Sequence, residues 1–246
     1  MTKQTAFRVE VGGRTVAGQF TQPATRKRPL HVVMFCRSSE STADAALTEQ
    51  FYDDLQVALL DAGLAVLRYA PPKLNENTDA GTQAATMVEA ACAAARWADL
   101  RDDVDHNSIG VLAYGPSALV AVAAASEIRI IRRLCLIDLA TQLPMATPEN
   151  GRGASHVAGN GELMVDSLLH QGGPTALTGF DGEVMFLNAA ADRVTPLNST
   201  LAYRRALENH QRVAEHVLIA RADHGYQDVS LRAVCAEQAT RFFLHR

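Results

Sequence analysis

The chain has 246 residues, of which 48% are hydrophobic and 20% charged, and its formal net charge is −4 at pH 7. This composition is that of a globular protein with a sizeable core, and it excludes a disordered or collagen-like chain. The slight acidic excess and the absence of a long basic run argue against nucleic acid or an anionic membrane as a partner.

Cysteine usage and hydropathy bear on the compartment. The four cysteines, Cys36, Cys92, Cys135 and Cys235, are widely spaced and form no C-x-x-C pair. This spacing favours reduced thiols and argues against a zinc site. No signal-peptide-like apolar stretch is visible at the N-terminus, and no segment approaches the ~18 consecutive apolar residues of a membrane span. We therefore expect a cytoplasmic protein.

Strands and helices are expected to alternate after an N-terminal hairpin at Gly12-Gly13. Apolar runs predict strands over 30–36, 64–69, 108–114, 132–138, 182–190 and 214–220. Helices are expected over 43–62, 82–100 and 116–126, and then after Thr195-Pro196 and after Asp228. In the last helix, one face is expected to be shared by Leu231, Val234, Cys235, Ala239 and Phe242.

The alternation of elements defines the fold class. Strand–helix–strand units connect by right-handed crossovers, so they predict a mostly parallel sheet covered by helices on both faces. We expect one α/β domain over residues 1–246. The segment 142–180 is rich in Gly, Pro and Asn and is long for a bare loop. It is interpreted as a small lid over the carboxyl ends of the strands.

Polar loops follow four of the expected strands, in the order "CRSSES", "AYGPS", "AAADRVTP" and "RADHGYQD". This order resembles the α/β-hydrolase family over nearly the whole chain. The resemblance is strongest to its small-lid branches, the dienelactone-hydrolase-like and serine-aminopeptidase-like esterases and peptidases, to which "GLAVLRYAPP" and "DHGYQD" are also similar. It implies an α/β-hydrolase fold with an eight-stranded sheet.

The resemblance assigns an acid and a base to the last two loops. Asp192 takes the place of the family's acid after the seventh strand, and His224 that of its histidine after the eighth. In such a pair the histidine accepts a proton near neutral pH, while the carboxylate fixes its tautomer. Alternatively, Asp192 is a turn residue and His224 a loop histidine bonded to backbone. Their joint placement favours the pair.

The nucleophile position departs from the family pattern. In the family a G-x-S-x-G turn presents the serine between a strand and a helix. Aligning the strand 109–112 with that pattern places Gly115 at the serine and Pro116 directly after it. Glycine suits the strained backbone but carries no nucleophile, and proline has no N–H to offer an oxyanion. Proline also suits the first turn of a helix.

A register shifted by two residues remains open. Gly115-Pro116-Ser117 would then begin the motif, with Ser117 as an alternative nucleophile, although Leu119 would stand where a small residue should pack. Otherwise Ser117 is a first-turn helix residue. Arg37, Ser38 and Tyr114, which follow or end neighbouring strands, are expected to line a pocket; Arg37 is equally interpreted as an exposed loop residue.

Two functional hypotheses follow. The first is a non-catalytic hydrolase homologue, a pseudoenzyme, that binds a small molecule or a partner through a pocket with Asp192 and His224. The second is a serine hydrolase of esters, thioesters or peptides that uses Ser117, His224 and Asp192. No dinucleotide or P-loop motif is present, so we expect no cofactor and no metal. The sequence leaves open whether the chain forms a homo-oligomer.

Overall fold

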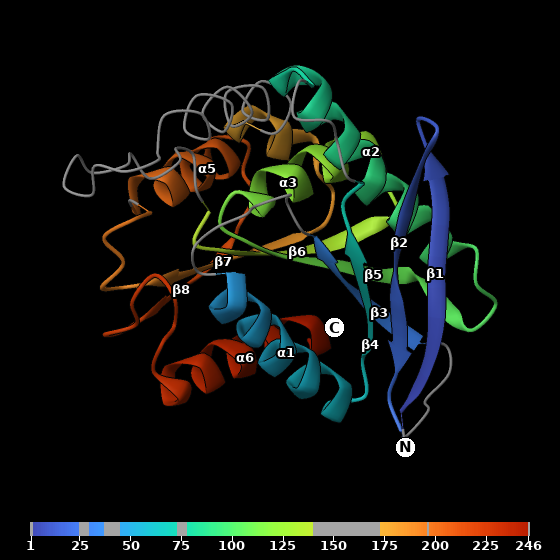
Figure 1. Ribbon diagram of the computed structural model, residues 1–246. Coiled ribbons are helices and arrows are strands. Elements are labelled where there is room, and N and C mark those ends of the chain that lie inside the picture. Colours follow the sequence, from blue (N-terminus) through green and yellow to red (C-terminus); the bar gives the residue numbers. More distant parts are fainter. Residues whose placement is uncertain are drawn as a thin grey trace, which may run out of the picture.

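The computed structural model describes residues 2–24, 30–36, 45–72, 78–139, 173–195 and 197–245. Its centre is an eight-stranded sheet in the order β1-β2-β4-β3-β5-β6-β7-β8 (Figure 1). The strands are β1 Lys3–Val11, β2 Arg14–Gln22, β3 Leu30–Cys36, β4 Ala65–Ala70, β5 Val104–Tyr114, β6 Ile131–Ile137, β7 Glu183–Ala189 and β8 Glu215–Ile219.

The sheet is antiparallel at one edge and parallel elsewhere. The hairpin of β1 and β2 turns at Gly12-Gly13, and β2 continues antiparallel against β4. From β4 through β3 to β8 all neighbouring strands are parallel. Their carboxyl ends therefore meet at one edge of the sheet, where loops from distant parts of the sequence come together. The expected fold class, a mostly parallel sheet with helices, is confirmed.

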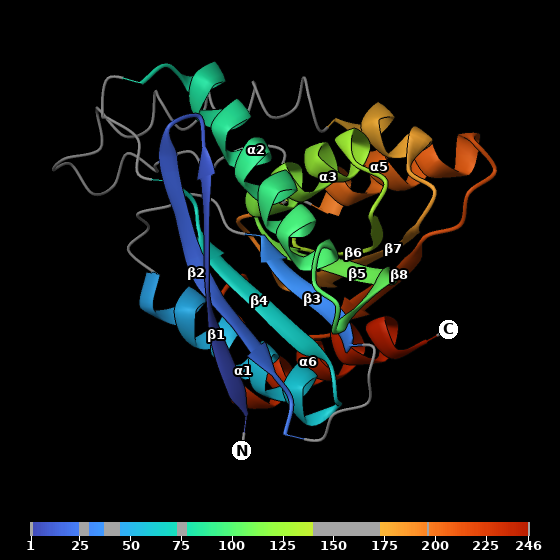
Figure 2. The same cartoon turned by 90° about the vertical axis from the view of Figure 1, so that its right-hand side faces the viewer.

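Helices cover both faces of the sheet. They are α1 Ala45–Asp61, α2 Ala80–Asp99, α3 Ser117–Glu127, α5 Leu197–Asn209 and α6 Val229–Leu244, with a short 3₁₀ helix, η1 Pro174–Gly179. Figures 1 and 2 show α1 and α6 on one face and α2, α3 and α5 on the other. Each face has its own hydrophobic cluster. Among the described residues, no helix combines the length and apolarity that crossing a membrane requires.

The strand that leads to the candidate site, β5, is buried on both faces. Val111 and Ala113 pack in the cluster under α2 and α3, and Leu112 packs in the cluster under α1 and α6. The next helix, α3, is buried at every position from Ser117 to Ala125. Such a helix must be apolar all round, and its many alanines let α2 and the sheet approach closely.

The last helix begins where the sequence predicted. Asp228 caps α6, as predicted, by accepting a hydrogen bond from the Ser230 N–H at 2.8 Å. Of the five residues expected to share one face, Val234 is 38% exposed, so that face is not buried throughout. The buried face is rotated toward Arg232, whose guanidinium forms an ion pair with Asp54 of α1 at 2.9 Å. An arginine can bury its aliphatic stem when its head group is paired, and apolarity alone does not reveal this.

Other expectations were met or lie outside the described residues. The strand predicted from residue 108 begins earlier, at Val104, because this residue still pairs with Leu30 of β3. Cys92, Cys135 and Cys235 are buried free thiols, as expected. Most of the predicted lid, 142–180, lies outside the described residues; of it, 173–180 contain η1. The lid and the single-domain organisation stay predictions.

Close packing of β5 against α6 gives a test of the fold. A Cβ added at Gly110 would lie 2.5 Å from the Phe243 ring, whereas one at Gly179 would meet nothing within 4 Å. We expect Gly110→Ala to lower the free energy of unfolding by about 1–3 kcal/mol through overpacking. Urea denaturation measures this, with Gly179→Ala as the matched control. Equal stability of the two variants would contradict the packing of β5 on α6.

Candidate functional site

The turn between β5 and α3 is left-handed at Gly115. Its φ is +59°, and its N–H donates to the Ile137 carbonyl at 2.9 Å, which extends the β5–β6 ladder into the turn. A side chain at this position would be strained by the backbone, but a Cβ would meet no atom within 4 Å. The predicted left-handed conformation of Gly115 is confirmed. Among the described residues, no atom occupies the space into which a side chain at this position would project.

Helix α3 starts directly after this turn. Pro116 is its N-cap residue, with φ −62° and ψ −26°, and carries no N–H. The Ala118 N–H donates to the Gly115 carbonyl at 3.1 Å, so the helical hydrogen bonds begin at once. Ser117 is therefore the first residue of the helix, and only 4% of it is exposed. Its use as a nucleophile stays a hypothesis.

Asp192 and His224 lie together at the carboxyl edge of the sheet. Asp192 follows β7 and His224 follows β8, and parallel pairing of these strands brings the two loops side by side. The His224 Nδ1 is 2.9 Å from the Asp192 Oδ2. The Asp192 side chain is 2% exposed and that of His224 31% exposed. The expected hydrogen-bonding distance is confirmed, while a catalytic role for the pair stays a proposal.

The Asp192 carboxyl group is held as an anion. Burial acts to raise its pKa, but the hydrogen bond from His224 opposes burial. The backbone N–H groups of Thr195 and Val194 also donate to Oδ1, at 3.0 and 2.6 Å, and the net result is a pKa below the ordinary value. The carboxylate therefore accepts the Nδ1 proton of His224. This tautomer leaves Nε2 of a neutral His224 able to take a proton from a bound molecule.

Tyr114, the last residue of β5, supports the histidine loop. Its hydroxyl donates to the His224 backbone carbonyl, and the two rings lie 5.7 Å apart between centroids. On its other side Tyr114 contacts Phe51 of α1, which stacks on Tyr226 at 5.0 Å. Sequence reasoning assigned Tyr114 only to a pocket wall. Arg37 and Ser38, the other predicted pocket residues, lie outside the described residues.

Sequence reasoning missed Asp138, which follows β6 and has a left-handed φ of +43°. It is 1% exposed, and its Oδ1 accepts hydrogen bonds from the Ala189 N–H at 2.8 Å and from the Asn188 amide at 3.5 Å. Burial raises its pKa to about 7, although the Ala189 N–H lowers it. A polar residue at the end of a predicted strand was the available signal.

Other features of the described residues bear on ligand binding. They include no group of three or more histidine, cysteine or acidic residues able to hold a metal ion.

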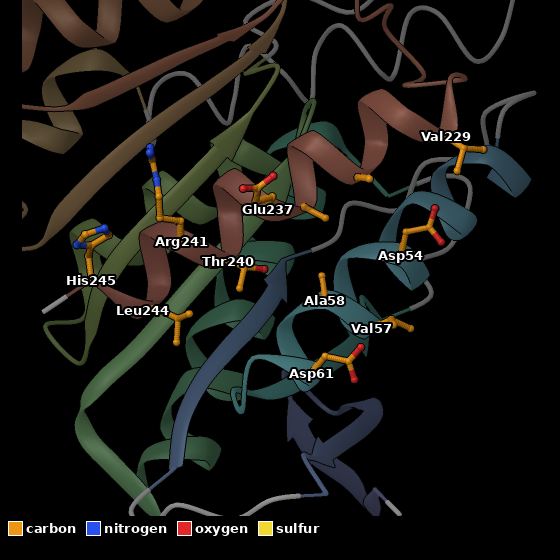
Figure 3. Close-up of a pocket in the computed structure, with 12 residues that line it drawn as sticks. Asp54, Val57, Ala58, Asp61, Val229, Glu237, Thr240, Arg241, Leu244 and His245 are labelled. Carbon is orange, nitrogen blue, oxygen red and sulfur yellow. The ribbon is translucent and has the colours of Figure 1, made fainter.

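A groove of about 850 Å³ lies between α1 and α6 (Figure 3). It is lined by Val57 and Ala58 of α1 and by Val229 and Leu244 of α6, among others. None of its lining residues belongs to the turn at Gly115 or to the Asp192–His224 pair.

Comparison with known proteins identifies the fold. No protein-family model matches the sequence, and no curated protein matches it. Among solved structures, Est1E from Butyrivibrio proteoclasticus has a TM-score of 0.74 at 16% identity over 97% of each chain. A dienelactone hydrolase from Anabaena variabilis has a TM-score of 0.67 at 18% identity, over 99% of this chain and 98% of its own.

A third similar structure is described as an alpha-beta serine hydrolase homologue from Coxiella burnetii, with a TM-score of 0.67 at 14% identity over 96% of each chain. At such identities the likeness concerns the fold. The chain has the α/β-hydrolase fold, as the sequence predicted, and its structural neighbours include esterases.

The raised pKa of Asp138 predicts how stability depends on pH. An unfolded aspartate loses its proton near pH 3.9, whereas folded Asp138 keeps it to about 7, so the folded state binds more protons between these values. Stability is therefore lost as pH rises through this window. Asp138→Asn removes the ionisation, and its stabilising effect should be larger at pH 8 than at pH 5 by about 2 kcal/mol.

Chemical denaturation at the two pH values measures this difference. The control is Asp181→Asn, because the ion pair with Arg212 lowers the pKa of Asp181 and its replacement should bring no gain that grows with pH. A pH-independent effect of Asp138→Asn would mean that Asp138 ionises at an ordinary pH in the folded protein.

Proposed function

We propose that this chain is an α/β-hydrolase-fold protein without conventional serine-hydrolase activity, which retains Asp192 and His224 in a pocket for a small-molecule ligand. The observation that supports this most is Gly115 at the left-handed turn, where the family pattern requires the serine. Asp192 orients His224, which could accept a proton from a nucleophile. Gly115, at the position of that nucleophile, has no side chain to supply one.

Pro116 supports the same proposal through the oxyanion. The N–H of the residue after the nucleophile is a main donor to the developing oxyanion in this fold. Pro116 has none, and losing one such donor commonly costs ~3 kcal/mol of transition-state stabilisation. Restoring a nucleophile alone would therefore leave the site without a main donor for the tetrahedral intermediate.

The second candidate function is a serine hydrolase of esters, thioesters or peptides that uses Ser117. The intact Asp192–His224 hydrogen bond favours it, as do the esterases among the structural neighbours. Against it, Ser117 lies two residues beyond the turn. At about 100° per residue, its side chain points well away from the direction of the side chain at the turn.

A serine-directed probe separates the two functions. Fluorophosphonates react with serines activated by a neighbouring base, so we expect the wild-type protein to remain unlabelled. p-Nitrophenyl acetate should be hydrolysed no faster than by His224→Ala. Mass spectrometry and absorbance measure the two effects. Labelling of Ser117 that disappears in His224→Ala would establish the serine hydrolase and overturn the preferred proposal.

Rebuilding the turn tests the oxyanion argument. A serine at position 115 would be strained by the left-handed backbone but would meet no described atom within 4 Å of its Cβ. Gly115→Ser should therefore fold with reduced stability and show little esterase activity. Combining it with Pro116→Ala returns the missing N–H, and we expect roughly 10²-fold more activity than in the single variant, the size of one oxyanion donor. Pro116→Ala alone is the control. Equal activity of the single and double serine variants would contradict the oxyanion argument.

A further inference from the structure

Asp138 is a second buried carboxyl group at the same edge of the sheet as Asp192. Its Oδ1 holds the Ala189 N–H at 2.8 Å, and Ala189 is the last residue of β7. The Ala189 carbonyl in turn accepts the Asp192 N–H at 3.3 Å. Asp138 thus fixes the point from which the chain turns toward Asp192.

A series of hydrogen bonds between side chains leads from Arg204 to Asp138. Arg204 can only donate, so its contact with the His216 Nδ1 at 3.0 Å requires that nitrogen to be unprotonated. The His216 Nε2–H then donates to the Asn188 Oδ1 at 3.1 Å. The Asn188 amide is left to donate to the Asp138 Oδ1 at 3.5 Å. Every donor in this series of hydrogen bonds therefore points toward Asp138.

The Tyr226 hydroxyl lies beside the Asp138 carboxyl group, and its hydrogen bond lowers the pKa of Asp138. A buried carboxyl group is costly to ionise, and an asparagine would keep the Ala189 contact without a charge.

The charged and titratable groups around Asp138 belong to the candidate site. Asp192 and His224 act on it from the loops after β7 and β8, the first raising and the second lowering its pKa. Tyr226 lies beside it, and Cys235 approaches from α6. Electrostatic interactions are mutual, so a charge on Asp138 also favours the protonated form of His224.

We propose that Asp138 is a positioning residue of the Asp192–His224 pair, which anchors the start of the Asp192 loop and places a second carboxyl group whose charge acts on His224. His224 would bind a proton more readily once Asp138 ionises. The inference rests on the proposed use of the pair for a bound ligand, but it concerns the free protein.

The test is the titration of the His224 imidazole, followed by nuclear magnetic resonance in wild type and in Asp138→Asn. In wild type we expect one broadened step, because a coupling of about half a unit between His224 and Asp138 is too weak to separate two steps. In the variant we expect one step, with the pKa of His224 lower by about half a unit. This is less than the 1–3 units of a directly paired carboxylate. Asp181→Asn is the control: Asp181 precedes the amino end of β7 and is paired with Arg212, and the variant should titrate like wild type.

The His224 Nδ1–H resonance separates charge from geometry. Asparagine still accepts the Ala189 N–H, so this resonance should persist in Asp138→Asn. An unchanged titration would overturn the proposal, because the charge of Asp138 would then not act on His224. Loss of the resonance would overturn it as well, because an asparagine that keeps the Ala189 contact would then fail to hold the pair in place. Fluorophosphonate labelling of Ser117 would instead refute the proposed function and leave the titration result standing.

Discussion

The double burial of β5 constrains everything at the candidate site. This strand is hydrogen-bonded to β3 and β6 and covered by helices on both faces, so the chain must turn sharply to leave it. The left-handed Gly115 makes that turn while its N–H still pairs with β6. The buried helix that follows then fixes Pro116 and Ser117. Packing of β5 and α3 and the hydrogen bond to β6 thus hold the backbone of this turn in place.

Two aspartates at one edge of the sheet show how surroundings decide chemistry. Asp192 is nearly inaccessible, yet three hydrogen bonds to its carboxylate keep its pKa low. Asp138 is also inaccessible, and burial outweighs the hydrogen bonds to its carboxyl group and raises its pKa to about 7. The first is a fixed anion that orients a histidine. The second changes charge in the range where a histidine also does.

The sequence predicted most of the fold because the relevant signals are local. Apolar runs, glycines and caps such as Asp228 mark strands and helices one by one, and the order of the polar loops indicated Asp192 and His224. Asp138 was not recognised because its importance depends on pairing of β6 with β7 and on depth of burial. The burial of Arg232 was not recognised because it depends on the ion pair with Asp54 of another helix.

The three buried thiols have a practical consequence. Cys135 lies on β6, Cys235 on α6 and Cys92 on α2. One thiol therefore lies in the central sheet and one in a helix on each face of the sheet. Burial raises the pKa of Cys135 and Cys235, which keeps them as unreactive thiols in the closed protein. A thiol reagent reaches them only when their surroundings open. The molecule thus carries its own reporters of local unfolding, distributed across both halves of the core.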